Sequence, residues 1–285
     1  MSTLAQSLNA AAEALARANV GSSRRNAESL LMFALGCDRT YIFSHPERVL
    51  NSDERSSFDN ALAQRLRGVP LQYITGHQEF WGLDFLVSTD VLIPRPETEH
   101  LVEAVLELVQ KSQACSMADV GTGSGCIALA LAKELPHAEI HAVDISAAAL
   151  EVARSNATRL GLAERVRFLE SDLLGAFSHD AARFDFVVSN PPYVSEGDKN
   201  FLQPEVRDFE PHSALFAGAK GLDVIERLIP QASQALKRGG WLLMEIGKGQ
   251  DLQVRHLLRE WGSVRFVADL QGIPRVVAAQ VPNSK

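Results

Sequence analysis

Residues 184–193 read FDFVVSNPPY, and this stretch decides how the fold of the chain is interpreted. Its first five residues form an apolar run rich in Val and Phe, which is typical of a buried strand in a parallel sheet. Neither proline carries the N–H that a sheet ladder needs, so the strand must end before them. Asn190 is therefore predicted at the carboxyl end of a strand, where open α/β sheets bind their ligands.

The tetrad at 190–193 (NPPY) can itself recognise a flat NH2 group. The side-chain oxygen of Asn190 and the carbonyl of Pro191 are hydrogen-bond acceptors, and Tyr193 offers an aromatic face beside them. Pro191 and Pro192 fix their own φ angles and so stiffen the turn. We expect a pocket for a planar nitrogen nucleophile, either an amide or an exocyclic base nitrogen. The alternative is a turn that only terminates the strand.

The composition of the chain bounds the class of protein. The 285 residues, 46% hydrophobic and 22% charged, are typical of a globular protein with room for two domains. The net charge of −7 argues against broad binding to a phosphate backbone. Neither a membrane span nor a signal peptide is predicted, because no long apolar run occurs and Glu13 interrupts the start. Three isolated cysteines (Cys37, Cys115, Cys126) form no CxxC pair, which favours a reducing cytoplasm.

Along the chain, the texture changes twice. Apolar residues recur at helical spacing over residues 4–66, which predicts a small helical domain at 1–69; the alternative is a mere packing appendage. Two β-rich segments broken by Gly, 71–76 and 80–87, predict a β-hairpin hinge at 70–97. A helix is then expected to run to about Lys111, opening a third part at 98–285.

In this third part, predicted strands alternate with predicted helices. Strands are expected at 117–120, 139–144, 166–169, 184–188, 241–246, 264–267 and 276–281, and helices at 126–135, 147–160, 222–236 (kinked at Pro230) and 252–261. Such alternation predicts an α/β fold with a doubly wound, mostly parallel sheet. The last two strands are close together in sequence, so at least one is expected to run antiparallel.

A glycine-rich loop, 119–125 (DVGTGSG), joins the first of these strands to its helix. Glycines let a ligand approach the backbone, and the start of a helix favours a negative group. Asp144 ends the second strand, where a carboxylate can accept both ribose hydroxyls of a nucleoside cofactor. A dinucleotide fingerprint would need glycine at Cys126. The observed G-x-G-x-G, with Asp119 two residues before it, resembles motif I of the S-adenosylmethionine-dependent methyltransferases.

Asp172 and Leu173 follow the third strand and are placed to meet an adenine, Asp172 by hydrogen bonding and Leu173 by backbone or apolar contact. The alternative for Asp172 is a helix cap. The full set of predicted cofactor-binding residues is Gly121, Thr122, Gly123, Ser124, Gly125, Asp144, Asp172, Leu173 and Asn190. No metal site is predicted, because His137 and His141 straddle a helix–strand joint and no carboxylate motif accompanies them.

These motifs together resemble a class I methyltransferase that acts on a planar nitrogen. The NPPY tetrad is shared with DNA adenine and some ribosomal RNA guanine methyltransferases. Segments 70–76, 80–82, 92–99, 209–215, 245–250 and 269–276 resemble the HemK/PrmC family, protein-(glutamine-N5) methyltransferases of peptide chain release factors. The resemblance covers nearly the whole chain. It departs at 217–222 (AGAKGL), where the family usually shows Gly-Gly and an acid before Gly-Leu.

The resemblance implies a seven-stranded class I sheet, S-adenosyl-L-methionine as the cofactor, and bacterial class-one release factors as partners. The substrate would be the glutamine of their Gly-Gly-Gln loop. Asn190, Pro191, Pro192 and Tyr193 would bind it, with Asn190 and the Pro191 carbonyl accepting its N–H groups and Tyr193 packing on the amide. No direct nucleic-acid or membrane partner is expected. Three alternatives stay open: the glutamine of a large-subunit ribosomal protein, an amino group of a nucleic acid, or a binding module with a relic cofactor site.

Overall fold

The computed structural model describes residues 2–109, 114–177 and 183–283. The chain forms two compact units. The helical unit comprises Met1–His77 together with Gln203–Phe209, and the sheet unit comprises Gln78–Leu202 and Glu210–Lys285. A short segment from the middle of the chain thus belongs with the N-terminal helices. Within the described residues, no helix has the length and apolar character that crossing a membrane requires.

The helical unit confirms that residues 4–66 form helices, as their apolar spacing predicts. It contains α1 (Leu4–Arg17), α2 (Ser23–Leu35), α3 (Arg39–Ser44), α4 (Ser52–Leu66), α5 (Leu71–Thr75) and α9 (Pro204–Phe209). Capping boxes start α1 at Thr3 and α4 at Asn51, so the first N–H groups of both helices are paired. Leu4, Leu30 and Phe58 lie in its fully buried core.

The side chain of Arg65 joins three parts of the helical unit. Its Nε donates to Asn26 Oδ1 at 2.8 Å and its Nη1 to the Val69 carbonyl at 2.9 Å. An ion pair at 2.7 Å links Arg65 to Glu205 on α9. Because the Arg65 side chain is only 9% exposed, this pair is better shielded from solvent than an ordinary surface pair. It attaches the mid-chain segment Gln203–Phe209 to the N-terminal helices.

The predicted hairpin exists, but the prediction of its first strand at 71–76 is wrong. Leu71–Thr75 is helix α5, and the hairpin is β1 (His77–Phe80) with β2 (Leu83–Leu86). The β-branched and aromatic residues of α5 favour a strand, but Ile74 is buried in the core of the helical unit, and such packing overrides propensity. Trp81 and Gly82 both have positive φ, as a two-residue hairpin turn of type I′ requires.

The sheet unit contains a mostly parallel sheet, as predicted. In the described residues its seven strands are β3 (Ser116–Val120), β4 (Glu139–Asp144), β5 (Val166–Glu170), β6 (Phe184–Ser189), β7 (Leu236–Glu245), β8 (Ser263–Ala268) and β9 (Pro274–Gln280). Their order is β5-β4-β3-β6-β7-β9-β8, and β9 runs antiparallel to both of its neighbours. β7 begins five residues before the predicted start at Trp241, because Leu236 already pairs with Phe184 across a register shift.

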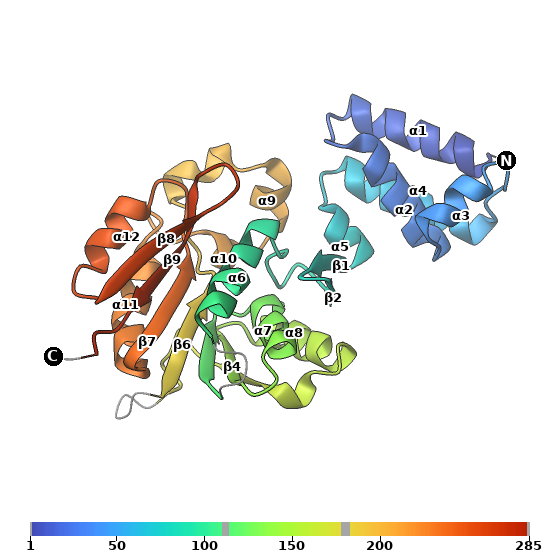
Figure 1. Cartoon of the computed structure of the whole chain (residues 1–285). Helices are drawn as coiled ribbons and strands as arrows, with labels where there is room; N and C mark the ends of the chain where they lie inside the picture. The colour runs from blue at the N-terminus through green and yellow to red at the C-terminus, as the bar shows by residue number, and fades with distance from the viewer. Residues whose placement is uncertain (1, 110–113, 178–182, 284–285) are drawn as a thin grey trace. The chain divides into compact units, whose positions relative to one another are not determined.

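Helices cover both faces of this sheet (Figure 1). α6 (Glu99–Leu108), α7 (Cys126–Glu134) and α8 (Ala147–Arg159) pack on one face, and α11 (Asp223–Ala235) and α12 (Asp251–Leu257) on the other. Consecutive strand residues such as Met117 and Ala118 enter opposite cores, so the strands are apolar throughout. The predicted end of the first of these helices, Lys111, lies outside the described residues. Pro230 lies inside α11, which continues to Ala235.

The remaining elements are short: η1 (Pro96–Thr98), η2 (Ala163–Arg165), η3 (Glu196–Phe201) and α10 (His212–Leu215). The strand order reverses at β3, since the chain moves outward through β4 and β5 and then returns to β6 on the other side. Such a switch point opens a crevice at the carboxyl ends of the strands. Val120 of β3 pairs with Ser189 of β6, and Ser189 with Met244 of β7, so three strand ends meet there.

Candidate active site

A cavity of about 280 Å³ lies at the carboxyl ends of these strands, within the sheet unit. Eight of the nine predicted cofactor-binding residues line it: Gly121, Thr122, Gly123, Ser124, Asp144, Asp172, Leu173 and Asn190. Gly125, the ninth, does not. Pro192 of the tetrad also lines the cavity, whereas Pro191 and Tyr193 are absent from its lining. The structure thus brings together the glycine loop, the two acids and Asn190.

The three glycines of the loop have two different roles. Gly121 and Gly123 have positive φ, and a Cβ on either would meet no atom within 4 Å. They leave open backbone beside the cavity, where a ligand can approach closely. A Cβ on Gly125 would lie 3.2 Å from both Ala153 Cβ and Leu129 Cδ1. Gly125 therefore serves the packing of α7 against α8.

Asp144 holds the glycine loop in place. Its Oδ2 accepts from the Gly123 N–H and its Oδ1 from the Ser146 N–H, both at 2.9 Å. Each carboxylate oxygen can accept more than one hydrogen bond. Because Asp144 also lines the cavity, it keeps acceptor capacity for the hydroxyls of a ligand.

Asp119 supports the same loop from below. Its Oδ2 accepts from Thr122 Oγ1 at 2.7 Å and from the Ala128 N–H at 3.2 Å, so it joins the loop to the first turn of α7. Burial raises the pKa of Asp119 to about 7, although these two hydrogen bonds act to lower it. Asp119 is a support of the loop and does not line the cavity.

Asp172 is paired with a residue that sequence reasoning missed. Its Oδ2 lies 2.5 Å from Nη2 of Arg227 on α11, and both residues line the cavity. The side chain of Asp172 therefore forms an ion pair here, and its hydrogen bond to an adenine stays a prediction. Leu173 adopts a positive φ of 52°, and such a conformation in a non-glycine residue is uncommon.

The side chain of Asn190 is held from the back of the cavity. Its Nδ2 donates to Thr98 Oγ1 at 3.0 Å. Thr98 Oγ1 donates in turn to Glu245 Oε2 at 2.6 Å, and Tyr193 Oη donates to Glu245 Oε1 at 3.0 Å. Burial and the neighbouring Glu245 raise the pKa of Tyr193 above its usual range, so its hydroxyl keeps the proton that it donates.

Sequence reasoning missed the roles of Thr98 and Glu245. Both lie in segments that carry the family resemblance, yet neither was given a function. Glu245 is an acid at the end of a buried strand, at the same edge of the sheet as Asn190. That position is the signal that could have found it. Burial raises the pKa of the Glu245 carboxyl, while the Thr98 and Tyr193 hydroxyls act to lower it.

Behind the tetrad, Gln250 joins two loops. Its Nε2 donates to the Tyr193 carbonyl at 3.0 Å and to the Gly221 carbonyl at 3.1 Å. A Cβ on Gly221 would lie 2.3 Å from the Tyr193 carbonyl oxygen, so glycine is required there. Segment 217–222, where the sequence departs from the family pattern, packs against the chain after the tetrad and does not line the cavity.

Arg95 provides a cation at the wall of the cavity. The buried carboxylate of Glu210 holds it through an ion pair at 2.5 Å and also accepts from the Ile93 N–H at 3.3 Å. The role of this arginine was also missed. In the described residues, no group of three or more His, Cys, Asp or Glu side chains could hold a metal ion. His141 lies on β4 and contacts Glu139 instead.

Comparison with known protein families gives two matches. The family described as the PrmC N-terminal domain matches residues 6–76, and the family described as the methyltransferase small domain matches residues 98–205. The first match lies within the helical unit. The second includes strands β3 to β6 of the sheet.

Full-length relatives are similar to this chain. The release factor glutamine methyltransferase of Koribacter versatilis is 53% identical over 282 residues, covering 99% of this chain and all of the relative. The protein of the same name from Geobacter sulfurreducens is 43% identical, covering 94% of this chain and 93% of the relative.

Solved structures share the fold at low sequence identity. A methyltransferase from Pyrococcus furiosus is 18% identical with a TM-score of 0.53, covering 79% of this chain and 99% of that one. The 16S rRNA N2 G1207 methyltransferase of T. thermophilus, solved with AdoMet and guanosine, is 20% identical with a TM-score of 0.52. It covers 72% of this chain and 49% of that one. These likenesses show a class I methyltransferase fold.

Proposed function

We propose a function on the premise that this chain belongs to the release factor glutamine methyltransferase family, as its likeness to full-length relatives shows. It transfers a methyl group from S-adenosyl-L-methionine to the side-chain amide nitrogen of a glutamine. The substrate is the glutamine of the Gly-Gly-Gln loop in bacterial class-one release factors. The observation that carries this proposal is the placing of Asn190 beside the glycine loop in one cavity.

The residues present fit S-adenosyl-L-methionine. Gly121 and Gly123 leave open backbone for it, and Asp144 has acceptor capacity for ribose hydroxyls. Leu173 supplies an apolar surface for the adenine, with Asp172 and Arg227 beside it. When bound, the cofactor supplies an electrophilic methyl group on a sulfonium.

The chain's own residues then orient the substrate nitrogen. A carboxamide nitrogen is a weak nucleophile because its lone pair is delocalised into the carbonyl. Asn190 Oδ1 accepts one N–H of the substrate amide and stabilises the positive charge that grows on nitrogen during transfer. Holding the substrate amide in one orientation would contribute most to the rate enhancement. No dedicated base is required, since the proton can leave after transfer.

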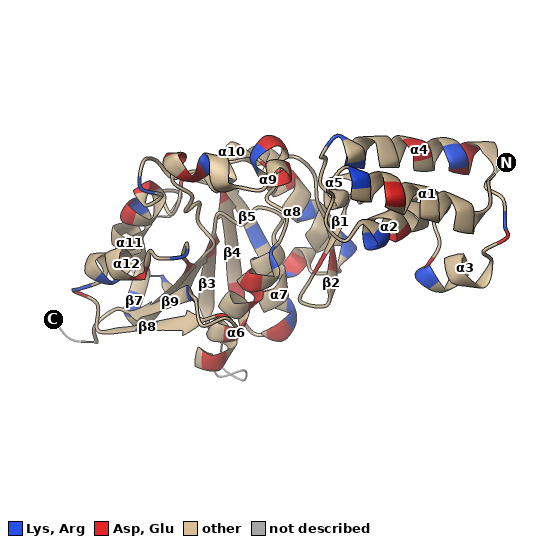
Figure 2. Ribbon diagram, turned by 90° about the horizontal axis from the view of Figure 1, so that it is seen from above, with Lys and Arg blue, Asp and Glu red and all other residues tan. Residues whose placement is uncertain are grey.

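The test is incubation of purified release factor with this protein and S-adenosyl-L-methionine, followed by peptide mass spectrometry. One added methyl on the glutamine of the Gly-Gly-Gln loop is expected. Methylation of a ribosomal protein glutamine or of a nucleic acid, with the release factor unmodified, would overturn the proposal. Lys and Arg are interspersed with Asp and Glu along the helices of each unit (Figure 2). Such mixed charge disfavours broad binding to a phosphate backbone and so favours a protein substrate over a nucleic acid.

We also propose that the helical unit recognises the body of the release factor, because a glutamine amide alone is small and common. Phe33 and Phe43, 45% and 50% exposed, are large apolar side chains on its surface. The double variant Phe33→Ala/Phe43→Ala should lower kcat/KM on whole release factor but not on a short Gly-Gly-Gln peptide. Leu252→Ala, an exposed apolar residue on α12, is the matched control. An unchanged kcat/KM in the double variant would refute this role for the two phenylalanines.

Surface variants test this role better than deletion of the N-terminal helices. The segment Gln203–Phe209 packs in the helical unit, and Glu205 pairs there with Arg65. Deleting residues 1–66 would therefore remove the partners of a segment that the rest of the chain retains. A loss of activity in such a truncation would not separate recognition from misfolding.

A further inference from the structure

The two ends of the Asn190 amide have opposite chemistry. Its oxygen accepts hydrogen bonds, whereas its NH2 group only donates them. A substrate NH2 group can be held by Oδ1 but would be repelled by Nδ2. The proposed reaction therefore requires one of two side-chain orientations that are nearly equal in shape. Something in the protein must select between them.

The selection begins at Glu245. Its carboxylate, when ionised, can only accept, and the hydroxyls of Thr98 and Tyr193 both donate to it, at 2.6 and 3.0 Å. Thr98 has a single hydroxyl proton, and it donates this proton in the hydrogen bond to Glu245. The Thr98 oxygen can then act toward Asn190 only as an acceptor.

Asn190 must consequently turn its NH2 group toward Thr98, where Nδ2 lies 3.0 Å from Oγ1. The opposite orientation would place two oxygen acceptors against each other with no proton between them. Thr98 and Glu245 are each 2% exposed, so water is a poor substitute for either partner. The cost of an unpaired polar group at such a buried position makes the selection strong.

We propose that Thr98 and Glu245 are positioning residues that fix the polarity of the Asn190 amide, so that its oxygen faces the substrate. This inference rests on the proposed function, because a nitrogen substrate is what requires an acceptor there. Glu245 does not line the cavity, and Thr98 lines it beside Asn190. Thr98 acts through Asn190, and Glu245 acts through Thr98.

The first test replaces Thr98 by Val, which keeps the shape and removes the hydroxyl, with Thr98→Ser as the matched control. Thr98→Val should lower kcat on release factor about tenfold or more and leave cofactor affinity within twofold, while Thr98→Ser stays close to wild type. In an Asn190→Ala background, Thr98→Val should cause no further loss. A wild-type kcat for Thr98→Val, or losses that multiply in the double variant, would overturn the proposal.

Glu245→Gln provides a second variant of nearly identical volume if Thr98→Val folds poorly. Its amide can donate to Thr98, which frees the threonine proton for Asn190 Oδ1 and permits the wrong orientation. A lowered kcat with unchanged cofactor affinity is expected. A wild-type kcat in the folded Glu245→Gln protein would contradict the role of Glu245.

A readout that needs no substrate separates this inference from the proposed function. In protein labelled with 15N-asparagine, the Asn190 side-chain NH2 resonances should shift in Thr98→Val but not in Thr98→Ser. If the wild-type protein leaves release factor unmethylated, the proposed substrate is wrong and the resonances still decide the coupling. Resonances unchanged by Thr98→Val would overturn the coupling itself.

Discussion

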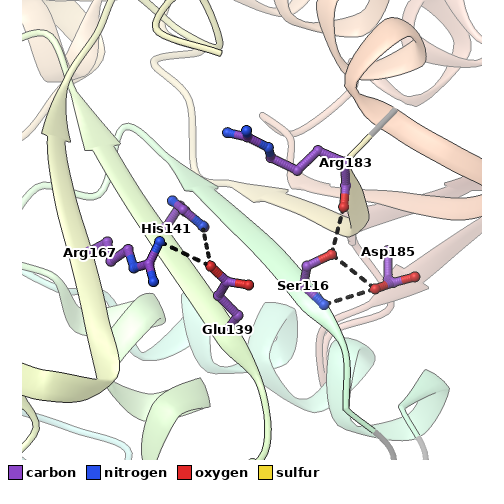
Figure 3. A network of polar contacts seen from close by, with 6 residues as sticks. All are labelled: Ser116, Glu139, His141, Arg167, Arg183 and Asp185. Atoms are coloured by element: carbon purple, nitrogen blue, oxygen red, sulfur yellow. Dashed lines mark hydrogen bonds and ion pairs between the residues drawn. The ribbon is translucent and has the colours of Figure 1, made fainter. Parts of the chain in front are cut away.

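The strands of the parallel sheet begin at one side, here called the amino edge, and end at the other, the carboxyl edge. Both edges carry polar residues, but these residues differ in how far they are buried. At the amino edge, Ser116 donates to Asp185 through both its N–H and its hydroxyl, at 2.8 and 3.0 Å (Figure 3). Beside it, Glu139 accepts from His141 at 3.2 Å and pairs with Arg167 at 3.3 Å. At the carboxyl edge, Asp119, Thr98 and Glu245 are almost fully buried.

Solvent exposure separates the ion pairs of the amino edge from the buried polar groups of the carboxyl edge. Glu139 and Arg167 keep most of their side chains in solvent, so their ion pair is screened and contributes little. The carboxyl-edge groups have no such solvation, and each relies on one or two defined partners. A buried polar group therefore couples to its neighbours, and a change in one propagates to the site. Substitutions at the carboxyl edge should alter binding or turnover, while those at the amino edge should alter stability alone.

The largest effect is expected for Asn190→Ala. It removes an acceptor that strengthens as charge grows on the substrate nitrogen, so the loss falls on kcat and not on cofactor affinity. Loss of one preorganised group of this kind costs about 10²–10³-fold in kcat. Stopped-flow or quench assays with saturating cofactor measure it, and thermal melting checks folding.

Asn190→Asp is the matched variant. It keeps an acceptor, so it should retain more activity than Asn190→Ala. It should still fall below wild type, because the one proton of Thr98 would then serve two carboxylates, at position 190 and at Glu245. A folded, cofactor-bound Asn190→Ala protein that turns over at the wild-type rate would show that the tetrad only terminates β6.

The second effect concerns Asp144. Asp144→Ala removes an acceptor for the ribose and frees the Gly123 N–H that it holds, so affinity for S-adenosyl-L-methionine should weaken by about 1.5–3 kcal/mol. Asp185→Ala is the control, since it removes the same side chain from the amino edge. Titration calorimetry should show no change in cofactor affinity for this control. Equal affinities of wild type and Asp144→Ala would remove Asp144 from the cofactor site.

Local chemistry explains which parts of this comparison the sequence could predict. The glycine loop, Asp144 and the tetrad each announce a strand end within a few residues, and parallel strands bring those ends to one edge. The link between Thr98 and Glu245 spans 147 residues, and it depends on how η1 packs beside the end of β7. No short motif contains that information. The pair between Asp172 and Arg227 was missed for the same reason.

The misassigned segment at α5 illustrates the opposite limit. Tyr73, Ile74 and Thr75 favour strand formation as a local sequence. Pro70 accepts from the Ile74 N–H through its carbonyl, and Gly76 ends the helix with a positive φ. Pro70 at the start of the helix, Gly76 at its end and the burial of Ile74 together outweigh the strand propensity of a segment only five residues long. Short elements are decided by their ends and their packing more than by their composition.

A smaller effect is expected from His141 at the amino edge. Burial between Phe177 and Phe184 lowers the pKa of His141; of the charged groups around it, Glu139 acts to raise this pKa, and Arg167 and Arg183 to lower it. A folded-state pKa below the ordinary 6.5 means that the fold favours the neutral ring. The contribution of the neutral ring to the free energy of unfolding is fully present above pH 6.5 and is lost as the pH falls below 6.5.

His141→Gln keeps a hydrogen-bond donor for Glu139 but does not titrate. Between pH 7.5 and 5.5, wild type should lose more unfolding free energy than this variant, by at most about 1.4 kcal/mol per pH unit below 6.5. Urea unfolding at the two pH values measures the difference. Parallel losses in the two proteins would show that the ring does not titrate differently in the folded state.

The smallest effect is expected for Lys237→Ala. Lys237 Nζ lies 2.8 Å from Asp185 Oδ2, and about half of the lysine side chain is exposed, so solvent screens the pair. Although partial burial acts to raise the pKa of Asp185, hydrogen bonds from Lys237 and Ser116 lower it, and Ser116 remains after the substitution. The unfolding free energy should therefore fall by at most about 1 kcal/mol, and by less at high salt.

Because this edge lies at the opposite end of the strands from Asn190, kcat and cofactor affinity of Lys237→Ala should equal those of wild type. A change in kcat or in cofactor affinity would mean that the two edges are coupled through the strands. Substitutions at the amino edge would then not affect stability alone.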